Sequence, residues 1–439
     1  FMTQEMNLEK EDMYQIDGPL DMTVFFGFCG IKGYNHLRYP EAHPHSPWSM
    51  LELKRTPETN IFDMIREKDL LIHLPYESFD ESVVNFLYSA ANDKDVLAIK
   101  QTLYRVSSSS PVVQALEKAV QNGKQVTVLM EVKARFDEAN NILMARRLEK
   151  AGAHVIYGLV GLKTHSKCTL VIRREKDGIR RYVHVATGNY NASTAKLYTD
   201  LGILTCNDRF GIDASAFFNL LSGYSDPPIW DSFIVAPINL RQRCIELIDR
   251  EIHFAKNGED AHMIAKMNSL LDKGIIEKLY EASQAGVKIE LIVRGICVLI
   301  PGIPGVSDNI TVRSIVGRFL EHSRIFWFRN GGREELYISS ADWMPRNLND
   351  RVELMVPIED PEIKRRLKQM VDIELSDNQK AHIMQADGTW LKTISAENQL
   401  CAQEYFQKIA EKRDAEDEMT LAQKLEPYTP VLGHGDGSD

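Results

Sequence analysis

Short apolar runs alternate along this chain with longer stretches whose apolar residues recur at helical spacing. The resulting strands and helices occur twice in a similar order. The first series comprises a strand at 96–103, a helix at 111–121, a strand at 126–132 and a helix at 138–150. The second comprises a strand at 261–267, a helix at 271–284 and strands at 289–293 and 310–315. This alternation predicts α/β units built on parallel or mixed sheets.

Each series continues into an apolar run that opens with a histidine and a cation two residues apart. His165-Ser166-Lys167 precedes the run 168–172, and His322-Ser323-Arg324 precedes the run 325–328. Further strands at 181–186 and 335–339 then lead into the small polar clusters 187–189 and 339–342. Self-similarity of this kind indicates a duplicated unit. We therefore expect two half-sites to face each other across a pseudo-twofold axis and form one active site.

The two tripeptides carry the groups that phosphate chemistry needs. Residues i and i+2 of a strand project from the same face, so each imidazole would lie beside a positive charge. A neutral imidazole is a competent nucleophile near pH 7, and cations stabilise a phosphoryl group in transfer. The motif alone is weak, because a third copy, His36-Leu37-Arg38, lies in a loop-like stretch and is interpreted as accidental.

The length of 439 residues predicts two or three domains. Residues 1–51 are rich in Gly and Pro and are interpreted as the remnant of a preceding domain. The first catalytic domain is expected at 52–232 and the second at 233–412, with a junction near 225–228. The charged and then Gly/Pro-rich stretch 413–439 is predicted to be a disordered tail.

Charge and cysteine usage narrow the partners and the compartment. The net charge of −10 disfavours non-specific binding of nucleic acid, so a polyanion would need a local basic cleft. Six cysteines without a C-x-x-C pair favour a reduced, cytoplasmic protein. No apolar run approaches the ~18 residues of a membrane span, and the start lacks the basic region of a signal peptide. Peripheral attachment to the inner membrane stays open.

Long sequence motifs around the two tripeptides resemble those of the polyphosphate kinases that carry two phospholipase-D-like domains. The resemblance extends over nearly the whole chain and implies two duplicated phospholipase-D-like α/β domains with mixed sheets. We expect this sequence to lack the family's N-terminal helical domain. The matching motifs are Ala98-Ile99-Lys100, Tyr104-Arg105-Val106, Lys133-Ala134-Arg135-Phe136-Asp137-Glu138, Gly161-Leu162-Lys163-Thr164-His165-Ser166-Lys167, Thr187-Gly188-Asn189-Tyr190-Asn191, Tyr198-Thr199-Asp200, Leu291-Ile292-Val293-Arg294-Gly295, Ser307-Asp308-Asn309-Ile310, Leu320-Glu321-His322 and Ser339-Ser340-Ala341-Asp342-Trp343-Met344.

The resemblance implies reversible transfer of the ATP γ-phosphate to inorganic polyphosphate through a phosphohistidine, with ADP as the second product. It makes His165 the phosphorylated nucleophile, assisted by Lys167, and His322 the second histidine, which acts as an acid or base or stabilises charge. It also implies Mg²⁺ as cofactor and a homo-oligomer, either a dimer or a tetramer. The positions implied to bind ATP are Tyr198, Arg294 and His322. Arg324 is expected to contribute to ATP binding as a cation that grips phosphate.

Arg105 and Arg135 correspond to positions beside Mg²⁺ in the resembling family. An arginine side chain has five donors and no acceptor, so it cannot ligate a cation directly. We therefore expect both residues to hold phosphate oxygens beside the ion.

Two other functions stay open. A phospholipase-D-type phosphodiesterase would use the same histidine pair, but its pattern adds an aspartate five residues after each cation. The residues at those positions are Ile172 and Arg329. A non-catalytic module that binds polyphosphate is the other alternative. Diester cleavage, ATP-dependent polymer formation, and binding without turnover distinguish the three.

Overall fold

A computed structural model describes residues 2–6, 8–51, 59–107, 109–132, 138–159, 161–223, 229–395 and 397–424. The chain divides into two units, residues 1–43 and 44–439. The first unit consists of short helical turns joined by loops, and its longest turn is the 3-10 helix η2 (Met22–Gly30). None of the residues in η2 is buried, and Phe26 is 79% exposed.

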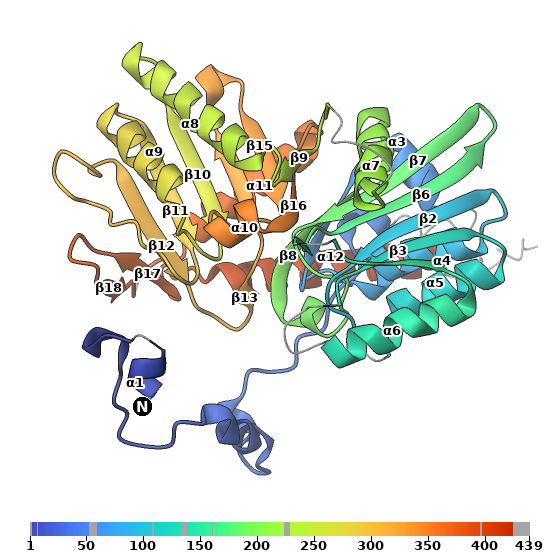
Figure 1. Ribbon diagram of the computed structural model, residues 1–439, viewed down its shortest axis with the longest axis horizontal. Coiled ribbons are helices and arrows are strands. Elements are labelled where there is room, and N and C mark those ends of the chain that lie inside the picture. The colour runs from blue at the N-terminus through green and yellow to red at the C-terminus, as the bar shows by residue number, and fades with distance from the viewer. Residues whose placement is uncertain are drawn as a thin grey trace, which may run out of the picture. The chain divides into compact units, whose positions relative to one another are not determined.

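The second unit contains two mixed sheets, each covered by its own helices (Figure 1). In the first sheet the strand order is β1-β8-β7-β6-β2-β3-β4, and β13 is added beside β8. Strands β2, β3 and β4 are parallel, whereas the other neighbours on this path are antiparallel. The strands are β1 (Leu70–Leu74), β2 (Val96–Leu103), β3 (Gln125–Met130), β4 (His154–Tyr157), β6 (Cys168–Glu175), β7 (Gly178–Ala186), β8 (Tyr198–Thr205) and β13 (Leu320–Glu321).

Helices cover both faces of the first sheet. One face packs against α3 (Ile61–Glu67), α4 (Asn85–Asn92), α5 (Pro111–Gln121) and α6 (Glu138–Ala151) through a continuous apolar core. The side chain of Ser110 caps helix α5 by accepting a hydrogen bond from the backbone N–H of Val113. Proline in the first turn has no backbone N–H that needs a partner. The other face packs against α7 (Asp208–Leu221).

The second sheet repeats this topology. Its central order β16-β15-β14-β10-β11-β12 has the same parallel and antiparallel pairings as β8-β7-β6-β2-β3-β4. The predicted α/β fold with two duplicated domains on mixed sheets is therefore confirmed. The remaining strands are β5 (Lys163–Thr164), β9 (Ile234–Ala236), β10 (His262–Met267), β11 (Lys288–Val293), β12 (Ile310–Ile315), β14 (Ile325–Phe328), β15 (Glu335–Ser339), β16 (Arg351–Pro357), β17 (Ala381–Met384) and β18 (Trp390–Lys392).

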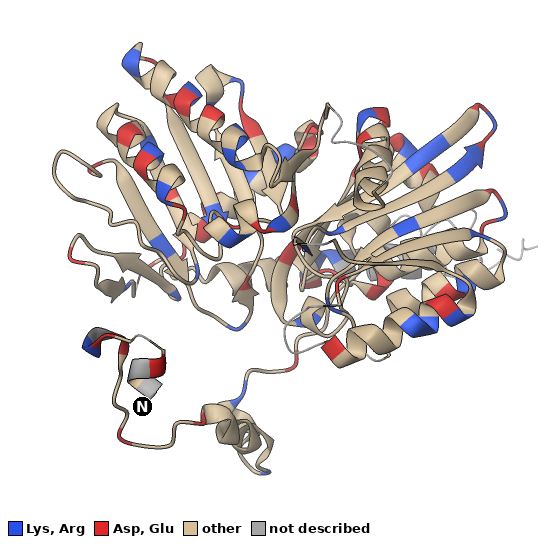
Figure 2. Ribbon diagram, viewed as in Figure 1, with Lys and Arg blue, Asp and Glu red and all other residues tan. Residues whose placement is uncertain are grey.

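One helix of the first half has no counterpart in the described part of the second. Helices α8 (Leu240–Lys256) and α9 (Lys273–Gln284) bury apolar residues in the core of the second sheet. Helix α6 connects β3 to β4, but the corresponding connection from β11 to β12, residues 294–309, contains no helix. Helix α11 (Pro361–Leu375) follows β16 as α7 follows β8. Charges of both signs are interspersed along α6, α8 and α9 (Figure 2).

Two very short strands connect the halves. Strand β5, which precedes His165, pairs in parallel with β16 of the second sheet. Strand β13, which precedes His322, pairs in parallel with β8 of the first sheet. The backbone N–H of His165 donates to the carbonyl of Val352 at 3.0 Å, and that of His322 donates to the carbonyl of Thr199 at 3.2 Å. Each histidine is thus held against a strand of the opposite half.

Helix α12 (Ala402–Lys424) extends into the stretch 413–439, for which a disordered tail is predicted. Residues 425–439 and the predicted junction at 225–228 lie outside the described residues. Among the helices that the structure describes, none is long and apolar enough to cross a membrane.

Candidate functional site

The first half-site is built around His165, at the connection from β5 to β6. Its Nδ1 lies 2.8 Å from Oε1 and 2.9 Å from Oε2 of Glu353, the third residue of β16. The Nζ atom of Lys167 lies 2.9 Å from Nδ1 and 3.1 Å from Nε2 of the same ring. The ring of Tyr104 packs edge-on at 4.7 Å between centroids. The imidazole is therefore held between a carboxylate and an ammonium.

The second half-site repeats this arrangement around His322. Its Nδ1 lies 2.8 Å from Oδ1 of Asp200, the third residue of β8. The Nη1 atom of Arg324 lies 3.2 Å from each ring nitrogen. Arg324 also donates to both carboxylate oxygens of Asp342, at 3.1 and 3.2 Å, which fixes the plane of the guanidinium. The ring of Tyr198 lies 5.2 Å from that of His322.

The carboxylates are exchanged between the halves. His165 comes from the first repeat and binds Glu353 of the second, whereas His322 comes from the second and binds Asp200 of the first. This follows from the pairing of β5 with β16 and of β13 with β8. Sequence reasoning missed a role for both carboxylates. Alignment of the two repeats would have found them, because each is the third residue of the last shared strand.

Burial dominates the electrostatics of the first half-site. Burial and the charge of Lys167 hold the pKa of His165 well below its usual value, and Arg324 and His322 of the other half add to this effect. Burial lowers the pKa of Lys167 to about 7. Burial also raises the pKa of Glu353 to about 7, against the attraction of Lys167. The His165 imidazole is therefore neutral at neutral pH, as a nucleophile must be.

The second half-site differs in its acid–base character. Burial and the charge of Arg324 lower the pKa of His322, although Asp200 opposes them. Burial raises the pKa of Asp200, but the contacts with His322 and a hydrogen bond from Thr187 outweigh it, so the net change is downward. Burial lowers the pKa of Arg324, but the Asp342 carboxylate outweighs this and raises it above its usual value. This half-site therefore keeps a permanent cation and an ionised carboxylate around its histidine.

The remaining predicted residues lie at different depths. Arg294 is half-buried, and its Nε and Nη2 donate to Oδ1 of Asn268 at 3.2 and 2.9 Å. The Asn268 amide in turn donates to the carbonyl of His322 at 3.2 Å, which connects Arg294 to the second half-site. Arg105 is half-buried in the segment after β2. Arg135 lies outside the described residues.

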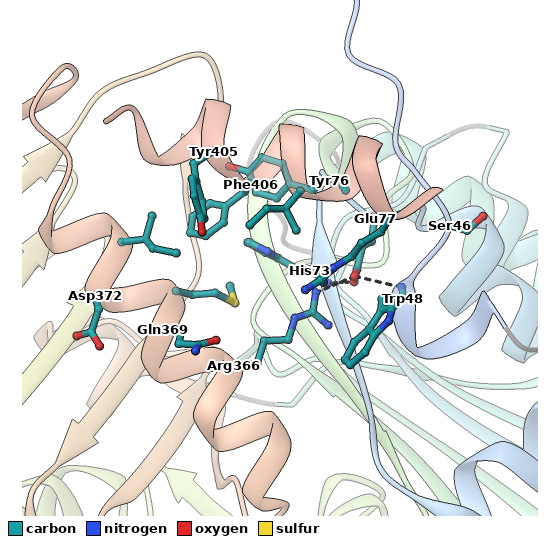
Figure 3. Close-up of a pocket in the computed structure, with 15 residues that line it drawn as sticks. Ser46, Trp48, His73, Tyr76, Glu77, Arg366, Gln369, Asp372, Tyr405 and Phe406 are labelled. Atoms are coloured by element: carbon teal, nitrogen blue, oxygen red, sulfur yellow. Dashed lines mark hydrogen bonds and ion pairs between the residues drawn. The ribbon is translucent and has the colours of Figure 1, made fainter. Parts of the chain in front are cut away.

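A cavity of about 430 Å³ lies elsewhere in the second unit (Figure 3). Its lining includes Trp48, His73, Arg366 and Phe406, and it contains none of the predicted site residues. Arg366 is paired with Glu77 at 2.7 Å on its wall. The histidine pair is therefore distinct from this cavity.

Within the described ranges no three His, Cys, Asp or Glu side chains cluster closely enough to hold a metal ion. Each carboxylate beside the histidines is already engaged: Glu353 by His165, Asp200 by His322 and Asp342 by Arg324. This donor set does not fit an all-protein magnesium cage. It fits an ion that is carried mainly by substrate phosphates and water, which is the usual binding mode of Mg²⁺.

Comparisons with known proteins agree with this geometry. The family model described as polyphosphate kinase C-terminal domain 1 matches residues 60–227, and that described as domain 2 matches residues 233–403. The polyphosphate kinase of Halalkalibacterium halodurans is 56% identical over 378 residues, covering 86% of this chain and 53% of that protein. The Bacillus anthracis polyphosphate kinase is 51% identical over 393 residues, covering 89% and 55%.

A solved structure extends the likeness to three dimensions. The crystal structure of polyphosphate kinase from Porphyromonas gingivalis aligns with a TM-score of 0.78 at 38% identity, covering 86% of this chain and 57% of that one. The chain spans about half the length of the curated relatives it matches. The two domain models together account for both halves of the histidine site. The chain belongs to the polyphosphate kinase family.

Proposed function

We propose that this chain carries the phosphoryl-transfer centre of a polyphosphate kinase, which moves the ATP γ-phosphate reversibly to inorganic polyphosphate through a phosphohistidine. The observation that carries the proposal is the pair of histidines, one buried and one half-buried, each between a cation and a carboxylate. Family membership supplies the substrates, ATP and polyphosphate.

In the first step, His165 attacks the γ-phosphorus of ATP. Its Nδ1 faces Glu353, so a proton on Nδ1 is held there and the lone pair of Nε2 is left for attack. The new N–P bond forms as the bond from the γ-phosphorus to the bridging oxygen breaks, and ADP leaves with the electron pair. Lys167, 3.1 Å from Nε2, supplies positive charge to the oxygens of the phosphoryl group.

In the second step, a terminal oxygen of polyphosphate attacks the phosphohistidine, the N–P bond breaks, and the chain is one phosphate longer. The second half-site stabilises the charge on the attacking oxygen and on the phosphoryl oxygens, and the His165 imidazole leaves with the electron pair of the N–P bond. His322 supplies or accepts a proton there, since Asp200 orients its ring. Arg324 supplies a charge that does not titrate. The reverse sequence of steps regenerates ATP.

Nucleotide binding is assigned to Tyr198, Arg294, His322 and Arg324. Tyr198 lies beside His322, where a ring or ribose can pack, and Arg294 has a guanidinium oriented by Asn268. Arg105 and Arg135 would grip phosphate oxygens next to the phosphate-borne Mg²⁺. When bound, the ion neutralises phosphate charge during transfer. The homo-oligomeric state and the cytoplasmic location stay predictions.

The deciding experiment incubates the protein with ATP labelled at the γ-phosphate, in the presence of Mg²⁺. A phosphohistidine gives label on the protein that is stable to alkali and labile to acid, and His165→Ala removes it. Addition of polyphosphate then discharges the label into polymer. Labelling that survives His165→Ala contradicts the assignment, and cleavage of a phosphodiester without labelling from ATP favours the phosphodiesterase alternative.

A further inference from the structure

We propose that Glu321 is a positioning residue that clamps His322 against the strand carrying Asp200. This inference rests on the proposed function for its kinetic consequence, but its structural content concerns the position of His322 alone. Glu321 is 3% exposed and immediately precedes His322 in the chain. Its side chain belongs to a buried polar cluster with Thr199, Lys266 and Gln403.

The carboxylate of Glu321 is bound by three other segments. Oε2 accepts from the hydroxyl of Thr199 on β8 at 2.8 Å and from Nζ of Lys266 on β10 at 2.6 Å. Oε1 accepts from the side-chain amide of Gln403 on α12 at 2.6 Å. One side chain thus ties the two-residue strand β13 to both sheets and to the C-terminal helix.

The clamp acts directly on Thr199 and Asp200, the two residues that hold His322. Thr199 immediately precedes Asp200, and its carbonyl and hydroxyl oxygens each lie 3.2 Å from the backbone nitrogen of His322. Glu321 fixes the Thr199 hydroxyl from the other side. The distance between His322 and Asp200 is therefore set by a short strand that has little pairing of its own, held in register by a buried carboxylate.

Among the described residues, the first half-site is held in a different way. Thr164 stands before His165 as Glu321 stands before His322, and it binds through its backbone N–H to Oε2 of Glu131 at 2.9 Å. The clamp is therefore a specialisation of the second half-site. The first half-site keeps its histidine in place without a carboxylate at this position. We therefore connect the clamp with the acid–base role proposed for His322, which His165 does not have.

Charge compensation allows the cluster to be buried. Lys266 is 2% exposed and also binds Glu374 of α11, so it neutralises Glu321 while holding a second carboxylate. Burial lowers the pKa of Lys266, but the charges and hydrogen bonds of Glu321 and Glu374 outweigh burial and raise this pKa to about 12. Glu374 binds Lys266 but, within the described part of the chain, forms no hydrogen bond or ion pair with Thr199 or β13, so it serves as the control.

The test compares Glu321→Gln, Thr199→Val and Thr199→Ser with the control Glu374→Gln. We expect Glu321→Gln to lower kcat by about 10²-fold with a smaller change in KM for ATP. A displaced His322 loses contacts that are made in the transition state, and these affect kcat more than substrate binding. Thr199→Val, which keeps the shape but removes the hydroxyl, should lower kcat as well, and Thr199→Ser should restore it. Glu374→Gln should leave kcat near that of the wild type.

A second readout does not depend on turnover. In protein labelled at histidine, the NMR signal of His322 is assigned by its loss in His322→Gln. Glu321→Gln and Thr199→Val should shift this signal, whereas Glu374→Gln should not. If wild-type protein fails to transfer phosphate, the proposed function fails while this signal still tests the clamp. Wild-type kcat together with an unshifted His322 signal in both Glu321→Gln and Thr199→Val would overturn the clamp.

Discussion

The imidazole of His165 is buried, and both of its nitrogens lie near a charged or ionisable group. Glu353 is within 2.8 Å of Nδ1, and Lys167 is 3.1 Å from Nε2. A buried group with several polar partners has little rotational freedom, so small chemical changes at those partners alter which nitrogen carries the proton.

The first prediction concerns Glu353→Gln. The substituted amide can present its NH₂ group to Nδ1, which moves the ring proton to Nε2 and removes the nucleophilic lone pair. We expect the rate of phosphoenzyme formation to fall by roughly 10²-fold or more. Rapid-quench labelling with γ-labelled ATP measures this rate. Glu359→Gln, which alters an exposed ion pair with Arg209, serves as control and should label at the wild-type rate.

The second prediction concerns pH. Because burial lowers the pKa of Lys167 to about 7, its ammonium loses its proton as pH rises through that value. If the charge of Lys167 assists transfer, kcat/KM falls on the alkaline side of about pH 7. In Lys167→Arg the guanidinium stays charged, so this alkaline limb should flatten even where the absolute rate is lower. An unchanged limb in Lys167→Arg would assign the titration to another group.

At the scale of elements, the turn between β7 and β8 must lie very close to the carboxylate that orients His322. A Cβ atom on Gly188 would fall 2.2 Å from Oδ2 of Asp200. Thr187, the residue before it, donates to Oδ1 of the same carboxylate at 2.6 Å. The glycine at this position is therefore required by space and not by an unusual backbone angle.

The third prediction is that Gly188→Ala displaces Asp200 from His322. Overpacking should cost about 1–3 kcal/mol of unfolding free energy and should also lower the transfer rate. Denaturant unfolding and labelling kinetics measure the two effects. Gly274→Ala is the control: it lies in the first turn of α9, where a Cβ makes only an ordinary contact at 3.5 Å, so it should be neutral or slightly stabilising. Equal behaviour of both variants would refute the crowding argument.

Apolar runs predicted the main strands closely, because strands covered by helices on both faces are rich in apolar residues. Strands β2, β12 and β14 have the predicted bounds. Strands β5 and β13 could not be predicted, since two residues have no period and their pairing depends on the opposite half. The same exchange hid Asp200 and Glu353. The repeat marks the surroundings of His165 and His322, which is why the sequence predicts both as site residues.

At the scale of the whole second unit, the exchanged strands make each sheet part of the other's structure. Strand β13 belongs to the first sheet and β5 to the second, and two histidine–carboxylate pairs, the buried His165–Glu353 and the part-buried His322–Asp200, cross between them. Loss of either sheet would leave polar groups of the other buried without partners, which is costly.

The fourth prediction is that both sheets unfold in a single transition. Hydrogen exchange followed by mass spectrometry across a denaturant series should show β2 and β10, the central strands of the two sheets, losing protection at the same denaturant concentration. Glu353→Gln should lower that concentration for both strands together. Separate midpoints for β2 and β10 would show that the exchanged strands contribute little to cooperativity.

The duplicated topology has a consequence for symmetry. Two identical subunits around a twofold axis must present identical half-sites to each other. A single chain that contains both copies is free of that constraint, and here one histidine faces a lysine and a glutamate while the other faces an arginine and an aspartate. One flank titrates near neutral pH, and the other keeps its charge. Divergence within one chain thus lets the two flanks of the site respond differently to pH, which two identical half-sites around a twofold axis could not do.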